Sequence, residues 1–304
     1  MPAGGALRPG RRLLRLLIAG ALASVVPAVA SAYPITPRSL WIQVEGAERI
    51  VLARVESKHR LRVVETWKGP HEEVLAVSSS ENVICPAPGR FEVDKLVIAF
   101  LAHGRQLAED DDGRWHPYGL SYGLVYTDDV GVSHFRRLAL AALELQRRGN
   151  VSDDERIAWL LDAASHAATR WDGLHDLEDP FIRMVPPDRR PRSLASKLTH
   201  EQRAGLARAF VADPGSGARI SDLLPFLWDV QDPSLDATIV ELLDRAVKAE
   251  EVAWWVGFQL RPVARWFAVD ESTIPENIWS LEGPAVREAW RALRARLPAQ
   301  RLTR

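Results

Sequence analysis

The densest group of side chains able to do chemistry lies at residues 172–179. Its acidic and histidine members are Asp172, His175, Asp176, Glu178 and Asp179. Carboxylates and imidazoles can bind a metal ion or exchange protons, provided that they converge within hydrogen-bond reach. The stretch lacks the D-x-D-x-D-G order and the closing Glu of a calcium loop, so a solvated acidic helix end is the simpler interpretation. Several of these side chains within about 4 Å of one another and of Asp128 would instead favour a hydrolase or a metal-dependent enzyme.

Residues 119–123 fit the pattern G-x-S-x-G, with Ser121 as the candidate nucleophile. In α/β-hydrolases this pattern forms a sharp turn between a strand and a helix whose amino terminus helps to bind the oxyanion. Here the following residues, Leu124 to Thr127, are typical of a strand, and no alternating pattern of strands and helices surrounds them. A glycine-flanked turn in a β structure is therefore favoured over a hydrolase site.

The other reactive residue types form no recognisable site. Cys85 is the only cysteine, and the neighbouring Ile84 and Pro86 favour a buried structural thiol over a reactive one. The eight histidines show neither H-E-x-x-H nor a zinc-type spacing with cysteine, and His166 is expected at a helix surface or cap. Asp110 to Asp112 are most simply a charged hairpin tip. The sequence thus assigns no catalytic residue, no cofactor-binding residue, no metal ligand and no cofactor.

Short β-branched runs between residues 50 and 101 predict a small β structure. They comprise residues 50–52, 61–66, 74–77 and 96–101. Gly69-Pro70, the polar residues 78–82 and the segment from Pro86 to Gly89 separate these runs, as turns separate strands. Asp112-Gly113 adds a hairpin turn, because glycine tolerates the positive φ that such turns need.

The hydrophobic period becomes helical after about residue 133. Apolar stripes occur at Leu138, Ala142 and Leu145, at Ile157, Leu160, Leu161, Ala164 and Ala168, and at Leu235, Ile239, Leu242, Leu243 and Ala246. Ser152 with Glu155 and Thr199 with Gln202 are capping-box pairs, and Pro284 suits a first helical turn. Successive helices with short joints predict antiparallel pairs, stacked as in HEAT or armadillo repeats or packed as an irregular bundle, since no motif recurs at a fixed period.

Aromatic side chains are concentrated in this second half. Most of the eleven tryptophans follow Trp159. One cluster, formed by Trp254, Trp255, Phe258, Trp266 and Phe267, spreads around more than one helical face. Because these rings cannot all point inward, some ring must pack against a neighbouring layer or be exposed. A packed core is the favoured interpretation, and a partner-binding groove is the alternative.

The first 32 residues have the three parts of an export signal. Four arginines (Arg8, Arg11, Arg12 and Arg15) begin it, residues 16–29 form an apolar run, and Ala30-Ser31-Ala32 is a small-residue cleavage site. The run is shorter than the roughly 20 residues that span a bilayer, so removal is favoured over a retained anchor. We therefore expect a secreted or periplasmic protein that begins at Tyr33, with a β-barrel domain at residues 33–132 and a helical domain at residues 133–304.

The first half resembles the amino-terminal domain of the tissue inhibitors of metalloproteases. The resemblance lies in residues 48–55, in residues 61–69 with their ending Trp67-Lys68-Gly69, in the spacing to Cys85, and in residues 96–101. It covers roughly residues 45–145 and implies a netrin-like, five-stranded barrel of the OB type. The fold class expected for the whole chain is therefore α+β and multidomain: a small OB-type barrel followed by an all-α domain, HEAT-like or an irregular bundle.

This chain departs from that family at the residues that inhibit proteases. The inhibitors chelate the protease metal through a mature amino-terminal cysteine, whereas Tyr33 is the expected first residue here. Cys85 matches a cysteine that the family pairs, but no second cysteine is present, and Ser121 lies about where another would fall. Inhibition of zinc metalloproteases is therefore not expected.

Composition limits the class of partner. The chain has 39 basic and 40 acidic residues, which argues against the basic face that nucleic acid requires. No segment after the signal is apolar and long enough to span a membrane. We therefore expect an exported, non-enzymatic protein that binds a protein or an envelope component. The alternative is an exported hydrolase or metal-dependent enzyme that uses the acidic and histidine residues of the helical half.

The signal assignment predicts that export removes residues 1–32. Replacing Ala32 by Arg should block processing, because the cleavage site accepts only small residues. Intact-mass measurement of the exported protein tests this, and a chain that retains Met1 to Ala32 in the exported fraction would contradict it.

Overall fold

Two long strands form the centre of an antiparallel sheet. In this computed structural model the described residues are 38–78, 90–103, 113–178, 193–215, 219–253 and 255–299. Strands β1 (Arg49–Ser57) and β2 (Arg60–Lys68) pair with Ser57 opposite Arg60, and β4 (Leu96–Ala102) pairs with the other side of β1. The sequence predicted both long strands and β4, with shorter bounds for β1 and β2.

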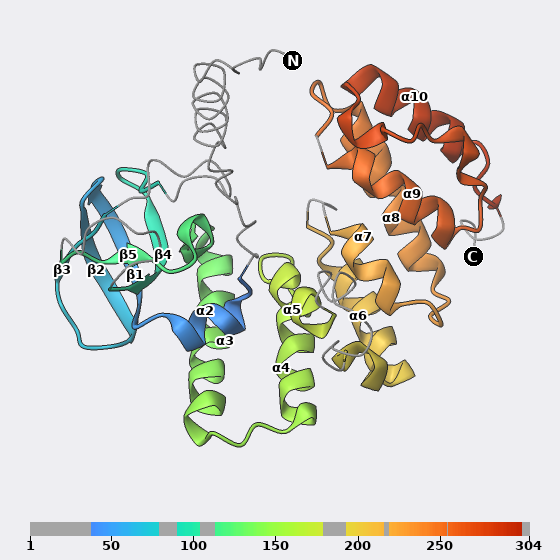
Figure 1. The fold of residues 1–304 in the computed structure, drawn as a ribbon. Helices are drawn as coiled ribbons and strands as arrows, with labels where there is room; N and C mark the ends of the chain where they lie inside the picture. The colour runs from blue at the N-terminus through green and yellow to red at the C-terminus, as the bar shows by residue number, and fades with distance from the viewer. Residues whose placement is uncertain are drawn as a thin grey trace, which may run out of the picture. The chain divides into compact units, whose positions relative to one another are not determined.

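Three short strands complete the sheet, whose order is β3-β2-β1-β4-β5 with β6 also paired to β4. They are β3 (Val74–Ala76), β5 (His116–Pro117) and β6 (Leu124–Val125). Three register shifts interrupt the β1–β2 pairing, between Ile50 and Val51, between Leu52 and Ala53, and between Val55 and Ser57. Such irregularities strengthen strand twist. The sheet curls into a half-barrel, and the fold is mixed α+β (Figure 1).

Both faces of the sheet are apolar, which explains the continuous hydrophobic runs in the sequence. Side chains on a strand alternate between faces. Val51, Ala53 and Val55 belong to one buried cluster with residues of β2, β3 and β4. Ile50 and Leu52 belong to a second cluster, which the sheet shares with helices.

Helices α2 (Leu40–Gly46) and α3 (Asp129–Arg148) contact the sheet through this second cluster. In Figure 1 the blue helix α2 lies against α3. Helix α2 was not predicted from the sequence, and the first helix of the second half was expected from about residue 133, whereas α3 begins at Asp129. One hydrophobic cluster therefore contains residues from both sides of the domain boundary expected at residues 132 and 133. All the described residues belong to one compact unit.

The remaining helical elements follow in chain order. They are α4 (Asp153–Ser165), α5 (Arg170–Leu177), η4 (Leu194–Lys197), α6 (His200–Ala212), α7 (Ile220–Leu223), η5 (Leu224–Phe226), α8 (Pro233–Lys248), α9 (Val256–Trp266), η6 (Glu271–Thr273), η7 (Ile278–Ser280) and α10 (Gly283–Arg294). Both predicted capping boxes are present, and Pro284 lies in the first turn of α10. The stripe predicted to reach Ala168 was too long, because α4 ends at Ser165 and Ala168 is exposed.

Tryptophan indoles form hydrogen bonds between several helices. Trp159 of α4 donates to the carbonyl of Leu138 on α3 at 3.0 Å. Trp266 and Trp290 donate to two carboxylates of α8, those of Asp236 at 2.6 Å and Asp244 at 2.7 Å respectively. Each bond satisfies a donor that burial would otherwise leave unpaired, so these rings fix how α9 and α10 pack on α8.

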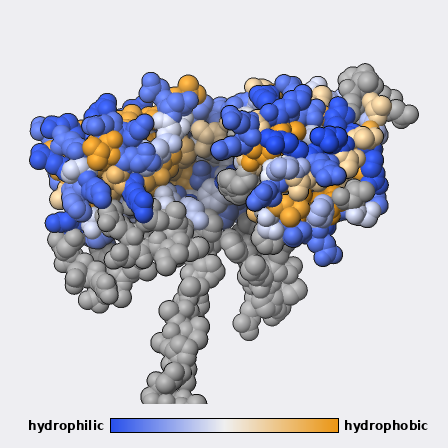
Figure 2. All heavy atoms as spheres, turned by 90° about the horizontal axis from the view of Figure 1, so that it is seen from above, coloured by the Kyte–Doolittle hydropathy of each residue, from blue (hydrophilic) through white to orange (hydrophobic). Residues whose placement is uncertain are grey.

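The aromatic cluster around α9 is mostly packed, as favoured from the sequence. Phe267 is buried and Trp255 and Trp266 are half-buried, whereas Phe258 is 47% exposed. Some ring was expected either to pack against a neighbouring layer or to be exposed, and Phe258 is exposed. On the face shown in Figure 2, hydrophobic residues are scattered among hydrophilic ones.

Some predictions fall outside the described residues. These concern the export signal at residues 1–32, Cys85, Asp110 to Asp112, Asp179 and Trp254. Among the helices of the described part, none is long and apolar enough to cross a bilayer.

Trp67 provides a test of the packing between sheet and helices. It lies near the end of β2, is 7% exposed, and belongs to the cluster shared with α2 and α3. Trp67→Ala should lower the free energy of unfolding by about 3–5 kcal/mol, because it removes a large buried ring. Val64→Ala on the same strand, where Val64 is 58% exposed, is the matched control and should change it by less than about 0.5 kcal/mol. Equal urea midpoints for the two variants would contradict this packing.

Candidate functional site

The G-x-S-x-G segment does not form a hydrolase turn. Gly119 adopts a left-handed conformation, φ 80°, and leads into the single-turn 3-10 helix η1 (Leu120–Gly123). Strand β6 follows directly, as the sequence predicted. Because a strand and not a helix directly follows the turn that contains Ser121, the turn lacks the helix amino terminus that binds the oxyanion in a hydrolase.

The acidic and histidine residues of α5 do converge, but they are buried rather than solvated. Asp172 and His175 are each 7% exposed, and the Asp176 side chain is 5% exposed. The interpretation of this segment as a solvated acidic helix end is therefore wrong for these three residues. Burial of a carboxylate is costly unless hydrogen bonds compensate for lost water, so their partners define what the cluster does.

The partners of the two carboxylates lie at the start of α2. Asp172 Oδ1 accepts the backbone N–H of Leu40 at 2.7 Å, and Asp176 Oδ2 accepts the hydroxyl of Ser39 at 2.8 Å. The same Ser39 oxygen caps α2 by accepting the N–H of Ile42. The carboxylates therefore satisfy polar groups at the amino terminus of α2 and hold that helix on α5. We call Asp172, Asp176, Ser39 and the Leu40 N–H the α2 anchor.

The order of the hydrogen bonds differs from that of a catalytic triad. His175 Nδ1 lies 3.2 Å from Asp176 Oδ1, so Asp176 stands between the serine and the histidine. A serine nucleophile needs the histidine in that middle place, because imidazole must take the serine proton. Ser39 is also fully buried. Asp128 does not complete the group, since its carboxylate caps α3 by accepting the N–H of Gly131 at 2.8 Å.

A close helix contact positions α5. Gly173 faces α4, where a Cβ atom would lie 2.3 Å from the carbonyl oxygen of Leu160. Only glycine permits this approach. At the start of α5, the buried Arg170 donates to the carbonyl of Ala164 at 3.2 Å and to that of Asp213. These contacts fix α5, the helix that carries Asp172 and Asp176 of the α2 anchor.

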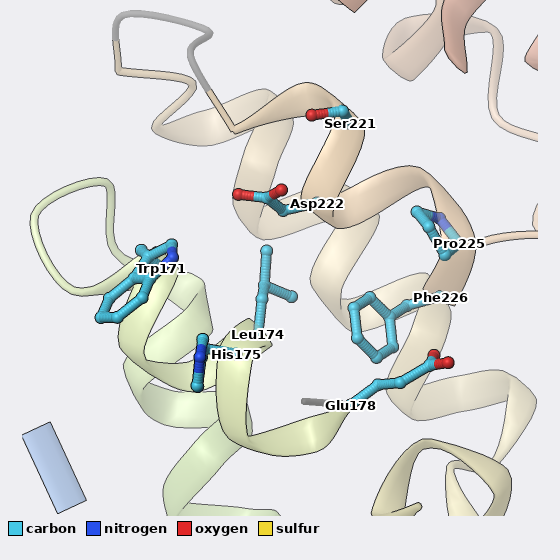
Figure 3. Close-up of a pocket in the computed structure, with 8 residues that line it drawn as sticks. All are labelled: Trp171, Leu174, His175, Glu178, Ser221, Asp222, Pro225 and Phe226. Atoms are coloured by element: carbon cyan, nitrogen blue, oxygen red, sulfur yellow. The ribbon is translucent and has the colours of Figure 1, made fainter. Parts of the chain in front are cut away.

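A small pocket lies beside the anchor, between α5 and the α7–η5 segment (Figure 3). Its volume is about 220 Å³, and it is lined by Trp171, Leu174, His175, Glu178, Ser221, Asp222, Pro225 and Phe226. Asp172 and Asp176 do not line it. The Nε2 atom of His175 is buried and has no hydrogen-bond partner. The carboxylates of the anchor are thus not placed to act on a molecule in this pocket.

His166 and His134 pack against each other at the end of α4. His166 ends α4 as its C-cap, as expected, and stacks on His134 with ring centroids 3.6 Å apart. Desolvation, with a smaller contribution from His134, lowers the pKa of His166. Within the described ranges, no group of three or more His, Cys, Asp or Glu side chains is placed to hold a metal ion.

A second and larger pocket lies between the carboxyl-terminal end of α8 and one face of α10. Its volume is about 480 Å³, within the range typical of ligand pockets, about 300–1,000 Å³. It is lined by Asp244, Val247, Lys248, Ala249, Glu250, Arg287, Trp290, Arg291 and Arg294. We call it the α8–α10 pocket. Val247 and Trp290 are the buried apolar residues of its lining, and we call these two side chains its floor.

Hydrogen bonds hold the walls of this pocket in place. Arg287 donates to three carbonyl oxygens at the end of α8, those of Val247 at 2.9 Å, Ala249 at 2.7 Å and Glu250 at 2.9 Å. Trp290 is fixed by its bond to Asp244, which also lies 3.6 Å from Arg294. Two lining side chains, Arg287 and Trp290, are therefore held in place before any ligand enters.

The α8–α10 pocket was not predicted from the sequence. One signal was available: Arg287, Trp290, Arg291 and Arg294 have the spacing of one helical face. That pattern is also common on solvated helix surfaces, and the opposing end of α8 could not be placed beside it from sequence alone.

Comparison with protein-family models, with curated proteins and with solved structures gave no match.

Asp172 makes stability depend on pH. Desolvation is the main cause that raises its pKa from 3.8 to about 7, and the nearby Asp176 adds to the shift, while the Leu40 hydrogen bond, His175 and Arg219 oppose it. Because the folded-state pKa is raised, the stability that Asp172 contributes is fully present below pH 3.8 and is lost as the pH rises through about 7.

Asp172→Asn should therefore remove this pH dependence, because its amide stays neutral and its oxygen can still accept the Leu40 N–H. We expect the variant to match the parent chain near pH 4 and to exceed it by about 2–4 kcal/mol near pH 8. Urea unfolding across this pH range measures the difference. Glu276→Gln, at an exposed position, is the control and should leave the pH profile unchanged. A variant less stable than the parent at pH 8 would contradict the account.

Proposed function

We propose that this chain is an exported, non-enzymatic binding protein whose ligand occupies the α8–α10 pocket. In this proposal the curled sheet is a netrin-like barrel of the OB type, and the helical half, HEAT-like or an irregular bundle, carries the binding site. The ligand is a component of the envelope or of the extracellular medium, because the signal-like residues 1–32 would direct the chain there.

The observation that supports binding most strongly is the construction of the α8–α10 pocket. A ligand binds more tightly when the protein does not have to order its own side chains on binding. Here Arg287 is fixed by three carbonyl oxygens and Trp290 by a carboxylate. The pocket volume of about 480 Å³ admits a small molecule or a short segment of a larger partner.

The α2 anchor accounts for the residues that an enzyme would use. A raised carboxylate pKa in a cleft would mark a functional site, but Asp172 is enclosed and bonded to a backbone N–H. Ser39 is likewise used to cap α2. The geometry therefore favours a structural role for these groups, and binding over catalysis.

Site-directed photo-crosslinking in the producing cell tests the proposal. A photo-reactive residue at Ala249, which is exposed and lines the α8–α10 pocket, should capture the ligand on irradiation. The same residue at Arg245, on the exposed side of α8 and outside the pocket, is the matched control.

Intact-mass measurement of the exported protein then reports any covalent adduct. We expect an adduct of defined mass at position 249 and none at position 245. Equal labelling at the two positions, or no adduct at position 249, would contradict a ligand site in this pocket.

A further inference from the structure

The charges around the α8–α10 pocket favour an anionic ligand. Four cationic side chains and two carboxylates line it. Arg287 is committed to the carbonyl oxygens at the end of α8, and Arg294 lies 3.6 Å from Asp244. Lys248 and Arg291 are both exposed, and within the described part of the chain neither side chain makes an ion pair or a hydrogen bond. Glu250 can offset only one of these two charges.

Basic side chains near helix carboxyl termini often serve only to complement the helix dipole. Lys248, in the last turn of α8, and Arg291 and Arg294, in the last turn of α10, all fit that description. Their shared position around one concave surface is the additional feature here. An anion at the rim would be attracted by the cationic side chains of α8 and of α10 together, whereas a cationic ligand would be repelled by them.

The floor of the pocket has a different character from its rim. Val247 and Trp290 are buried apolar residues, and the indole N–H of Trp290 is already used by Asp244. The aliphatic stems of the lining arginines add further apolar surface below their charged groups. The floor therefore offers apolar contact to a ligand, and the rim offers positive charge.

We propose that the α8–α10 pocket binds a single-chain amphiphile with an anionic head group, with the chain on the Trp290 and Val247 floor and the head beside Lys248 and Arg291. This inference rests on the proposed function and specifies its ligand class. A carboxylate and a phosphate head group share the chemistry that these side chains recognise, so both are included as probes.

Calorimetric titration of the full mature chain with four matched probes tests the ligand class. The probes are octanoate, octyl phosphate, octyltrimethylammonium and octanol, all below their micellar concentrations. Octanoate or octyl phosphate should bind at least about tenfold more tightly than octyltrimethylammonium or octanol, because the charged hydrogen bonds form only with the anions. The stronger of the two anions distinguishes a carboxylate ligand from a phosphate ligand.

Variants at the rim locate the binding. Arg291→Gln and Lys248→Gln should each weaken binding of the preferred anion by about threefold to tenfold. Both positions are exposed, so the variants should fold as the parent does. Arg245→Gln, on the same helix as Lys248 but outside the pocket, is the control and should leave the affinity unchanged. The indole N–H resonance of Trp290, assigned through Trp290→Phe, should shift with the preferred anion in the parent chain.

Three results would overturn the inference: equal affinity for the cationic probe, no binding of either anion at millimolar concentration, or unchanged affinity in both rim variants. These failures are distinct from failure of the proposed function. If crosslinking at Ala249 captures a ligand while both anions fail to bind, the pocket remains a binding site and the ligand class is wrong.

Discussion

The attachment of α2 to α5 is the constraint on which the rest of the fold depends. Asp172 and Asp176 bind Leu40 and Ser39 across 132 and 137 residues of sequence. Helix α2 in turn contacts α3 and the sheet, and its Trp41 ring meets Trp159 of α4 edge-on at 5.2 Å. Lys68 at the end of β2 also donates to the carbonyl of Val44 at 2.8 Å. One short helix thus joins the sheet to the first helices that follow it.

This anchor is built from groups that are costly to bury, and the cost is visible in the raised pKa of Asp172. Hydrogen bonds to a backbone N–H and a hydroxyl offset the burial only in part. Because an apolar contact of similar volume is often as stabilising as a buried polar one, we interpret the anchor as fixing the position of α2 rather than adding much stability. It also accounts for a serine, a histidine and two aspartates lying together without forming a catalytic arrangement.

Local patterns in the sequence predicted most of the secondary structure. The β-branched runs gave β1, β2 and β4, and Ser152 and Thr199 marked the starts of α4 and α6, because those signals act within a few residues. Helix α2 was missed, since it has only seven residues and depends on packing against distant elements. The burial of Asp172 and Asp176 was missed for the same reason: their partners lie on a helix that the sequence pattern did not reveal.

The α8–α10 pocket illustrates a second limit of sequence reasoning. The spacing of Arg287, Trp290, Arg291 and Arg294 shows that they share a face, but not what faces them. The carbonyl oxygens at the end of α8 supply that missing side, and Arg287 joins the two. A ligand site is thereby formed from residue types that a surface helix commonly carries.

The most direct measurement is a crystal structure of the chain purified from its native exported fraction without added ligand. We expect density for a bound molecule in the α8–α10 pocket, with its anionic group beside Arg291 and Lys248 and its apolar part over Trp290. An empty α8–α10 pocket with a molecule bound instead between α5 and α7, beside His175, would contradict it.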